Sequence, residues 1–155
     1  MGSLLAVDLG IRTGLALYGG EGRLVWYRSQ NYGSRDRLRR AINGILGDIP
    51  DLEVLVIEGG GALAVPWERE AERRGIAVLR TSAEEWRLRL LLPRQQRSGA
   101  QAKHSAGSAA RRVIRWSGAP SPTSLRHDAA EAILAGLWGV MRMGWLAEPP
   151  RLGGK

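Results

Sequence analysis

Four acidic residues lie at positions where the presence of a charged side chain calls for a functional explanation. Asp8 and Glu58 each end a run of four apolar residues, and Asp128 and Glu131 follow later in the chain, three positions apart. A carboxylate at the inner end of a buried strand is costly to keep charged unless a cation compensates it. Residues three apart on a helix share one face. We therefore expect Asp8 to hold a divalent metal ion and the rest of the chain to bring further ligands to it.

Other interpretations of these acids stay open from the residues alone. Asp-x-Gly after a strand also forms turns in which the carboxylate accepts backbone N–H groups. Sugar kinases and actin-like ATPases open with a similar hairpin that holds phosphate, although they need two such domains and 155 residues is short for that. Acids are also favoured in the first turn of a helix, which explains Asp128 better than Glu131.

The expected elements place these acids on neighbouring parts of one fold. The apolar runs 4–7 and 15–17, joined by a tight connection that Gly10 and Gly14 bracket, are expected to form a hairpin. Ser34 and Ser82 are expected to cap helices. The last helix is expected to open with Thr123 or Ser124 as its N-cap. We expect strands at 4–8, 15–17, 23–28, 53–58 and 76–79, and helices at 35–46, 67–74, 101–116 and 125–143, with one more from 83 towards 93.

The composition excludes several kinds of site and partner. The chain has no cysteine and two histidines, so we expect neither disulfides nor a thiolate or histidine-rich zinc site. It has no run of about 20 apolar residues, so no membrane span is expected. The N-terminus lacks the pattern of a signal peptide. The expected location is the cytoplasm, and no organic cofactor is expected.

The positive charge is concentrated in one segment. The formal net charge is +8, residues 87–127 carry nine cations with no Asp or Glu, and the rest of the chain sums to −1. Nearly all of these cations are arginine, whose planar fork suits bidentate contacts to phosphate. A solubilising surface is the other explanation, and the absence of acids argues against it. The segment therefore predicts binding to nucleic acid.

The order βββαβαβ followed by further helices, with carboxylates at these places, resembles the ribonuclease H-like fold. Within that fold, the chain from residue 4 to about 143 resembles the RuvC-type Holliday-junction resolvases, including their plant chloroplast relatives. Four segments carry the resemblance: AVDLGIRTGLAL, VLVIEGGG, EEWRLRLLLPRQQRSGAQAK and RHDAAEAILAGL. It implies an α/β domain over 1–145 with a five-stranded mixed sheet, three antiparallel N-terminal strands plus two parallel ones, flanked by helices. Residues 146–155 are expected to form a flexible tail.

The resemblance also implies the site residues. The expected carboxylate tetrad consists of Asp8, Glu58, Asp128 and Glu131. In the family such a tetrad binds two Mg²⁺ or Mn²⁺ ions, and carboxylates suit these hard cations. Two ions about 4 Å apart can activate a water and stabilise the leaving 3′ oxygen in an in-line attack on phosphorus. Lys103 matches the family's basic-loop lysine and is expected at the scissile phosphate. His127 is an alternative ligand or proton carrier, and a structural role in the first turn of a helix explains it equally well.

The chain departs from the family's pattern at two places. Bacterial members carry an aromatic wedge shortly after the acid that matches Glu58, where Gly61 and Ala62 stand here. Trp67 or Trp86 is a conceivable substitute. The last acid is Glu131 where many members have Asp. Both departures concern the specificity for the junction rather than the metal site.

The function implied by the resemblance is metal-dependent, structure-specific cleavage of DNA. The enzyme would resolve four-way (Holliday) junctions by paired phosphodiester hydrolysis, as a homodimer that supplies two active sites. The expected phosphate contacts are Arg94, Arg97, Lys103, Arg111 and Arg112. One alternative is a nuclease that processes structured RNA such as ribosomal RNA precursors. Another is a non-catalytic nucleic-acid-binding module, which has no reason to keep closely spaced carboxylates that repel phosphate.

Overall fold

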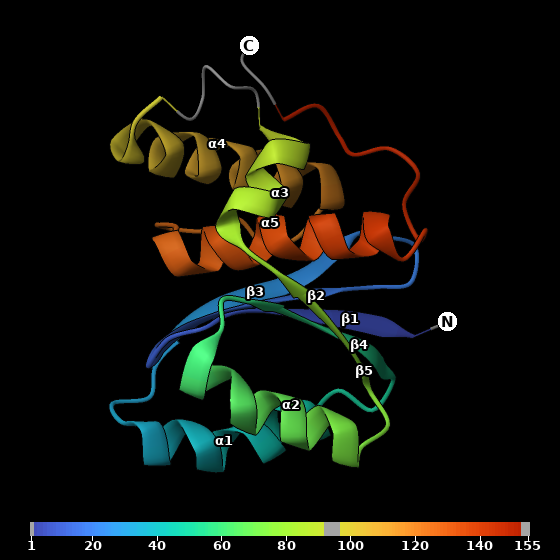
Figure 1. Cartoon of the computed structure of the whole chain (residues 1–155). Coiled ribbons are helices and arrows are strands. Elements are labelled where there is room, and N and C mark those ends of the chain that lie inside the picture. Colours follow the sequence, from blue (N-terminus) through green and yellow to red (C-terminus); the bar gives the residue numbers. More distant parts are fainter. Residues whose placement is uncertain (1, 92–96, 153–155) are drawn as a thin grey trace.

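The two apolar runs that end in acids form neighbouring strands at the centre of one sheet (Figure 1). The structure, a computed structural model, describes residues 2–91 and 97–152. In it, β1 (Ser3–Asp8) and β4 (Leu52–Glu58) pair in parallel, with Asp8 opposite Glu58. Their apolar side chains are buried on both faces of the sheet, as continuous rather than alternating hydrophobicity predicts.

The remaining strands complete the mixed sheet that was expected. The hairpin partner β2 (Arg12–Tyr18) is antiparallel to β1, and β3 (Leu24–Asn31) is antiparallel to β2. On the other side, β5 (Ala77–Thr81) is parallel to β4. The order is therefore β3-β2-β1-β4-β5, with three antiparallel N-terminal strands and two parallel additions. The prediction of the fold class is confirmed.

Helices cover both faces of the sheet (Figure 1). One face packs against α1 (Arg35–Gly47) and α2 (Ala64–Arg73), which follows the short 3₁₀ helix η1 (Gly61–Leu63). The other face packs against α5 (His127–Arg142), with α3 (Ala83–Leu90) and α4 (Gly99–Ser117) outside it. No helix in the described part of the chain is long and apolar enough to cross a membrane.

Small residues let α5 approach the sheet closely. A Cβ added at Gly136 would lie 2.4 Å from the ring of Tyr18, and one at Gly139 would lie 2.6 Å from Val56. Neither glycine could become alanine without a shift of its neighbours. The start of α5 thereby carries its acids down to the sheet.

The helix starts agree with the sequence in some places and correct it in others. Ser34 and Ser82 cap α1 and α3 as expected, since each hydroxyl accepts a backbone N–H from the first turn. The expected start of the last helix at 125, capped by Thr123 or Ser124, is wrong. Arg126 takes the N-cap position in extended backbone, and α5 begins at His127. The preceding loop is tied to β3, because the Tyr27 hydroxyl donates to the carbonyl of Pro120.

Two other helices begin earlier than expected. The second helix was expected at 67–74 but runs from Ala64 to Arg73, because Pro66 is tolerated within the first turn of a helix. The fourth begins at Gly99, where the Ser98 hydroxyl accepts the N–H of Gln101. The expected division into a domain and a flexible tail stays a prediction. Within the expected tail, Leu152 is only 6% exposed and packs against the core beside α5.

Candidate active site

The strand register aligns five residues in a row across the sheet. From the β3 edge to the β5 edge, they are Ser29, Gly14, Asp8, Glu58 and Thr81. Successive side chains of a strand point to opposite faces. Residues 4, 6, 54 and 56 pack beneath α5, so Asp8 and Glu58 also face α5. The two strand-ending acids therefore share one edge of the sheet.

Gly14 allows the start of α5 to touch the sheet. A Cβ at this position would lie 2.0 Å from the backbone carbonyl oxygen of Asp128. The sequence had placed Gly14 at the tight connection after β1, but it lies inside β2. Its role is the close approach of the helix backbone, which brings Asp128 over the row and next to Asp8.

Asp128 is held in place by two hydrogen bonds. The Ser29 hydroxyl donates to its Oδ2 at 2.9 Å, and the backbone N–H of Ala129 donates to its Oδ1 at 2.8 Å. Ser29 reaches Asp128 from β3, an edge strand of the sheet. Sequence reasoning missed Ser29, because a single serine in an amphipathic edge strand carries no signal of its own.

Asp8 and Glu58 form a buried pair of acids. Glu58 is only 7% exposed, and its Oε1 accepts a hydrogen bond of 2.6 Å from the indole N–H of Trp86. Asp8 lies directly opposite Glu58 in the parallel strand pair, so the two carboxyl groups are neighbours. Burial raises the pKa of Asp8 well above its usual range, and Glu58, Glu131 and Asp128 raise it further. A divalent cation would relieve this repulsion.

Glu131 completes the group from the second turn of α5. Its side chain is buried, and its Oε1 lies 3.3 Å from the guanidinium of Arg87 and 3.4 Å from Nε2 of His127. Burial raises the pKa of Glu131 to about 7, with a further contribution from Glu58 and opposition from Arg87 and Lys103. Its Oε2 is buried and has no hydrogen-bond partner among the described residues.

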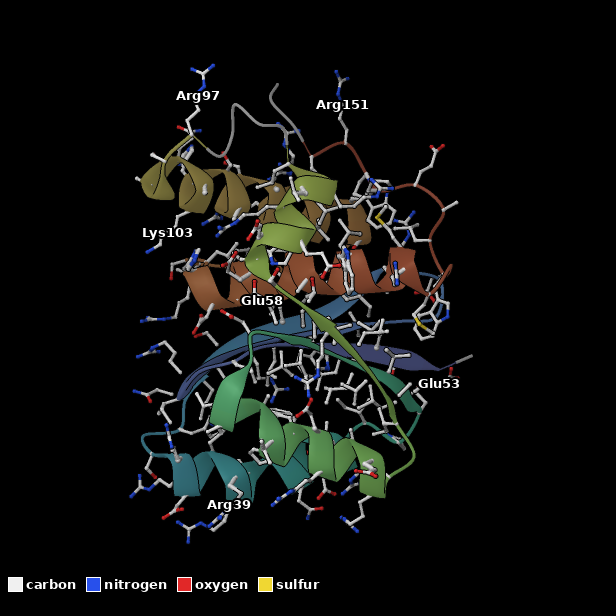
Figure 2. All side chains as sticks on the ribbon, viewed as in Figure 1. Arg39, Glu53, Glu58, Arg97, Lys103 and Arg151 are labelled. Atoms are coloured by element: carbon white, nitrogen blue, oxygen red, sulfur yellow. The ribbon has the colours of Figure 1, made fainter. Side chains whose placement is uncertain are left out.

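The basic residues expected to contact phosphate lie in different parts of the structure. Lys103 projects from the start of α4 above the end of the sheet where Glu58 lies, whereas Arg97, just before α4, points away from the sheet (Figure 2). Lys103 is close enough to the acids to oppose the rise in the pKa of Glu131, and with burial it lowers the pKa of His127. Arg111 lies near Tyr27 on β3. Arg112 is half-buried on α4. Arg94 lies outside the described residues.

The two tryptophans considered as substitutes for an aromatic wedge have other positions. Trp67 packs in the core beneath the sheet and Trp86 packs above it, and both side chains are fully buried. Neither projects from the surface. Trp86 instead orients Glu58, a role that its position in a short amphipathic helix did not reveal.

The donor set fits a divalent cation of the Mg²⁺ or Mn²⁺ type, since it consists of carboxylate oxygens. The unpartnered Oε2 of Glu131 is a place where a cation can be accepted. Among residues 2–91 and 97–152, no three acidic or histidine side chains are already gathered in an arrangement that could hold an ion. Binding of one ion by several of these acids therefore requires their side chains to move closer together.

Two solved structures resemble this fold over nearly its whole length. RuvC of T. thermophilus, solved in complex with a Holliday junction substrate, has a TM-score of 0.63 and 17% sequence identity, covering 93% of this chain and 97% of that one. The yeast mitochondrial Holliday junction resolvase Ydc2 has a TM-score of 0.54 and 11% identity, covering 92% and 81%. Neither a protein-family model nor a curated protein matches the chain. At these identities the likeness shows the fold, which is that of the RuvC-type resolvases.

Proposed function

We propose that this chain is a metal-dependent endonuclease that resolves four-way DNA junctions by paired phosphodiester hydrolysis. The observation that carries the proposal is the meeting of four carboxylates from three elements on one side of the sheet. The members of this tetrad are Asp8 from β1, Glu58 from β4, and Asp128 and Glu131 from α5. The other three all raise the pKa of Asp8, so they lie close to it, and side-chain movements would bring the four onto common ions.

The tetrad would hold two Mg²⁺ or Mn²⁺ ions, with Asp8 at its centre between Glu58 and Asp128. Such ions supply an activated water and stabilise the leaving oxygen of the phosphodiester. Around them, Ser29 and Trp86 hold the carboxylates of Asp128 and Glu58 in fixed directions through their hydrogen bonds. Fixed outer partners of this kind tune metal affinity and activity.

The cations around the tetrad would bind the substrate's phosphates. Lys103 faces the acids and is proposed to contact the scissile phosphate, where it offsets the developing charge. Arg94, Arg97, Arg111 and Arg112 would contact the DNA backbone on either side. His127 lies beside Glu131 and is proposed as an additional ligand or proton carrier. Two symmetric cuts in a junction need two sites, so the active form would be a homodimer.

The test compares the wild-type protein with Asp8→Asn on three labelled substrates: a four-way junction, a linear duplex and a structured RNA. Each is incubated with Mg²⁺, Mn²⁺ or EDTA. We expect paired nicks on the junction alone, lost in the variant and in EDTA. Cleavage of RNA with intact junctions would instead establish an RNA-processing nuclease. Tight binding of junctions without cleavage in any metal would establish a non-catalytic binding module.

A further inference from the structure

A row of positive charges follows α4, which lies outside α5 at the surface of the molecule (Figure 1). Lys103, Arg111 and Arg115 are exposed, and their intervals of eight and four residues place them on one side of the helix. No salt bridge joins any of the three to an acid among the described residues. The rise of an α-helix separates the first and the last of them by about 18 Å, which matches about five base pairs of a DNA duplex. We call these three residues the α4 row.

The tertiary structure adds a cation that the basic segment of the sequence does not contain. Arg23 lies between β2 and β3, and its guanidinium is 4.2 Å from the centre of the Trp116 ring. The same guanidinium donates to the backbone carbonyl of Trp116 at 2.5 Å. These contacts hold Arg23 at the last turn of α4, which also carries Arg115. The helix dipole favours a cation at this end of a helix, but it does not explain the row that leads back to Lys103.

The α4 row has a gap at Gly107, midway between Lys103 and Arg111. A glycine inside a helix costs about 1 kcal/mol relative to alanine. Packing does not require glycine here, because nothing lies within 4 Å of a Cβ added at Gly107. The absence of a side chain lets a ligand approach the helix backbone closely, with a cation on either side.

We propose that the α4 row binds the sugar–phosphate backbone of one duplex arm of the junction. The backbone would pass over Gly107 and reach Arg115 and Arg23 at the far end of α4. The inference rests on the proposed nuclease function and extends it from the cut to the arm that leads away from it. Lys103 joins the two, because it also faces the carboxylates. Contacts to phosphate position a duplex without reading its sequence, so this surface would fix the direction of the arm.

The first test fills the gap without changing the charge. Gly107→Leu adds a side chain that cannot donate to phosphate, and Gly44→Leu is the matched control. Gly44 is an exposed glycine inside α1, on the opposite face of the sheet, and nothing lies within 4 Å of its added Cβ either. Both changes introduce a better helix former, so neither variant should unfold at a lower temperature than its parent.

Binding is measured by fluorescence anisotropy in an Asp8→Asn background, which should bind the junction without cutting it. We expect Gly107→Leu to lower the affinity about tenfold at about 0.1 M salt, as loss of one phosphate contact predicts. Gly44→Leu should leave the affinity unchanged. Equal affinities of the two glycine variants would overturn the inference.

The second test locates the contact on the DNA. Junctions carry short patches of neutral methylphosphonate at successive positions along one arm. Their affinities are compared between the Asp8→Asn protein and the same protein with Arg23→Ala and Arg115→Ala. We expect a patch about five base pairs from the cut to weaken binding of the first protein about tenfold, and to have little effect on the second, which has already lost that contact.

The inference is also overturned if every patch weakens binding of both proteins equally. Failure of the proposed function gives a different result, because the wild-type protein would then cut no junction with Mg²⁺ or Mn²⁺. Cleavage of junctions together with equal binding by Gly107→Leu and Gly44→Leu would refute the α4 contact and leave the nuclease standing.

Discussion

The acids of the candidate site oppose one another more than any other group of side chains described here. Asp8 sits at the centre of the row, and the other three acids all raise its pKa beyond the effect of burial. Partial compensation comes from Arg87 and Lys103, which act on Glu131. Without a divalent ion, the site is therefore a source of instability at neutral pH.

Replacing Asp8 with asparagine should separate stability from activity. Asp8→Asn keeps the shape of the side chain and removes the ionisable group, so the metal-free protein should unfold at a higher temperature than the wild type. Cleavage should be lost, because the proposed central metal ligand is gone. Differential scanning calorimetry in EDTA and a junction cleavage assay measure the two effects. A lower unfolding temperature for the variant would contradict the repulsion inferred here.

The stability of the metal-free protein should fall as the pH rises. Glu131 has a folded pKa of about 7 against an ordinary value of 4.5, and Asp8 is raised as well. Between the ordinary and the folded pKa of each group, the folded state binds more protons than the unfolded state. The free energy of unfolding therefore falls as the pH rises through that interval. Divalent metal competes with these protons, so the thermal shift caused by Mn²⁺ should grow from about pH 5 to about pH 8. Glu131→Gln should weaken the pH dependence of both the stability and the thermal shift caused by Mn²⁺. The same pH dependence in the variant and the wild type would argue against this account.

The indole of Trp86 should matter through its hydrogen bond as well as its volume. Trp86→Phe removes the donor to Glu58, and Trp67→Phe is the control, since the indole nitrogen of Trp67 has no hydrogen-bond partner among the described residues. Both changes remove packing contacts. Trp86→Phe should lower the free energy of unfolding, measured by chemical denaturation, by about 1–3 kcal/mol more than Trp67→Phe does. Cleavage should fall about tenfold or more for Trp86→Phe only. Equal losses of activity would show that Trp86 acts through packing alone.

At the scale of elements, the site depends on how closely α5 lies on β2. Gly14→Ala would bring a methyl group against the carbonyl of Asp128 and displace the start of α5. We expect a loss of about 1–3 kcal/mol in unfolding free energy and a large loss of cleavage. Gly44→Ala in α1 is the control, because nothing lies within 4 Å of the added Cβ, and it should stabilise by up to about 1 kcal/mol. Full activity in Gly14→Ala would mean that α5 can shift without harm.

At the scale of the whole molecule, opposite charges occupy neighbouring layers. Glu58 lies between the sheet and α5, which itself carries Asp128 and Glu131, and α3 and α4 of the basic segment lie beyond α5 (Figure 2). Attraction of DNA by the outer cations must overcome repulsion by the acids, which a bound metal would reduce. Affinity for the junction should therefore fall steeply with salt.

Individual phosphate contacts can be counted from that salt dependence. In an Asp8→Asn background that binds without cutting, Lys103→Ala and Arg111→Ala should each lower the slope of log affinity against log salt by about 1. Arg142→Ala, at the opposite end of α5 from the acids, is the control and should leave the slope unchanged. Titrations by fluorescence anisotropy at several salt concentrations measure this slope. An unchanged slope for Lys103→Ala would remove it from the DNA-binding surface.

The sequence by itself determined the elements and the positions of the acids along them. Runs such as the one ending at Glu58 are long enough and apolar enough to specify buried strands, and Ser34 and Ser82 specify helix starts through local hydrogen bonds. Such signals are short-range, so they can be read from neighbouring residues. The resemblance to a known family supplied the fold class and the expected grouping of the acids before any contact between them was visible.

Only the tertiary structure decided which residues surround those acids. The register aligned Ser29 with Gly14 and Asp8, and packing placed Trp86 on Glu58 and Arg23 against Trp116. The true start of α5 was also decided there, since the loop before it is held by β3 rather than by a cap. Each of these contacts joins residues far apart in the chain. Their energies depend on pairing and close packing between elements, which periodicity and propensity do not contain.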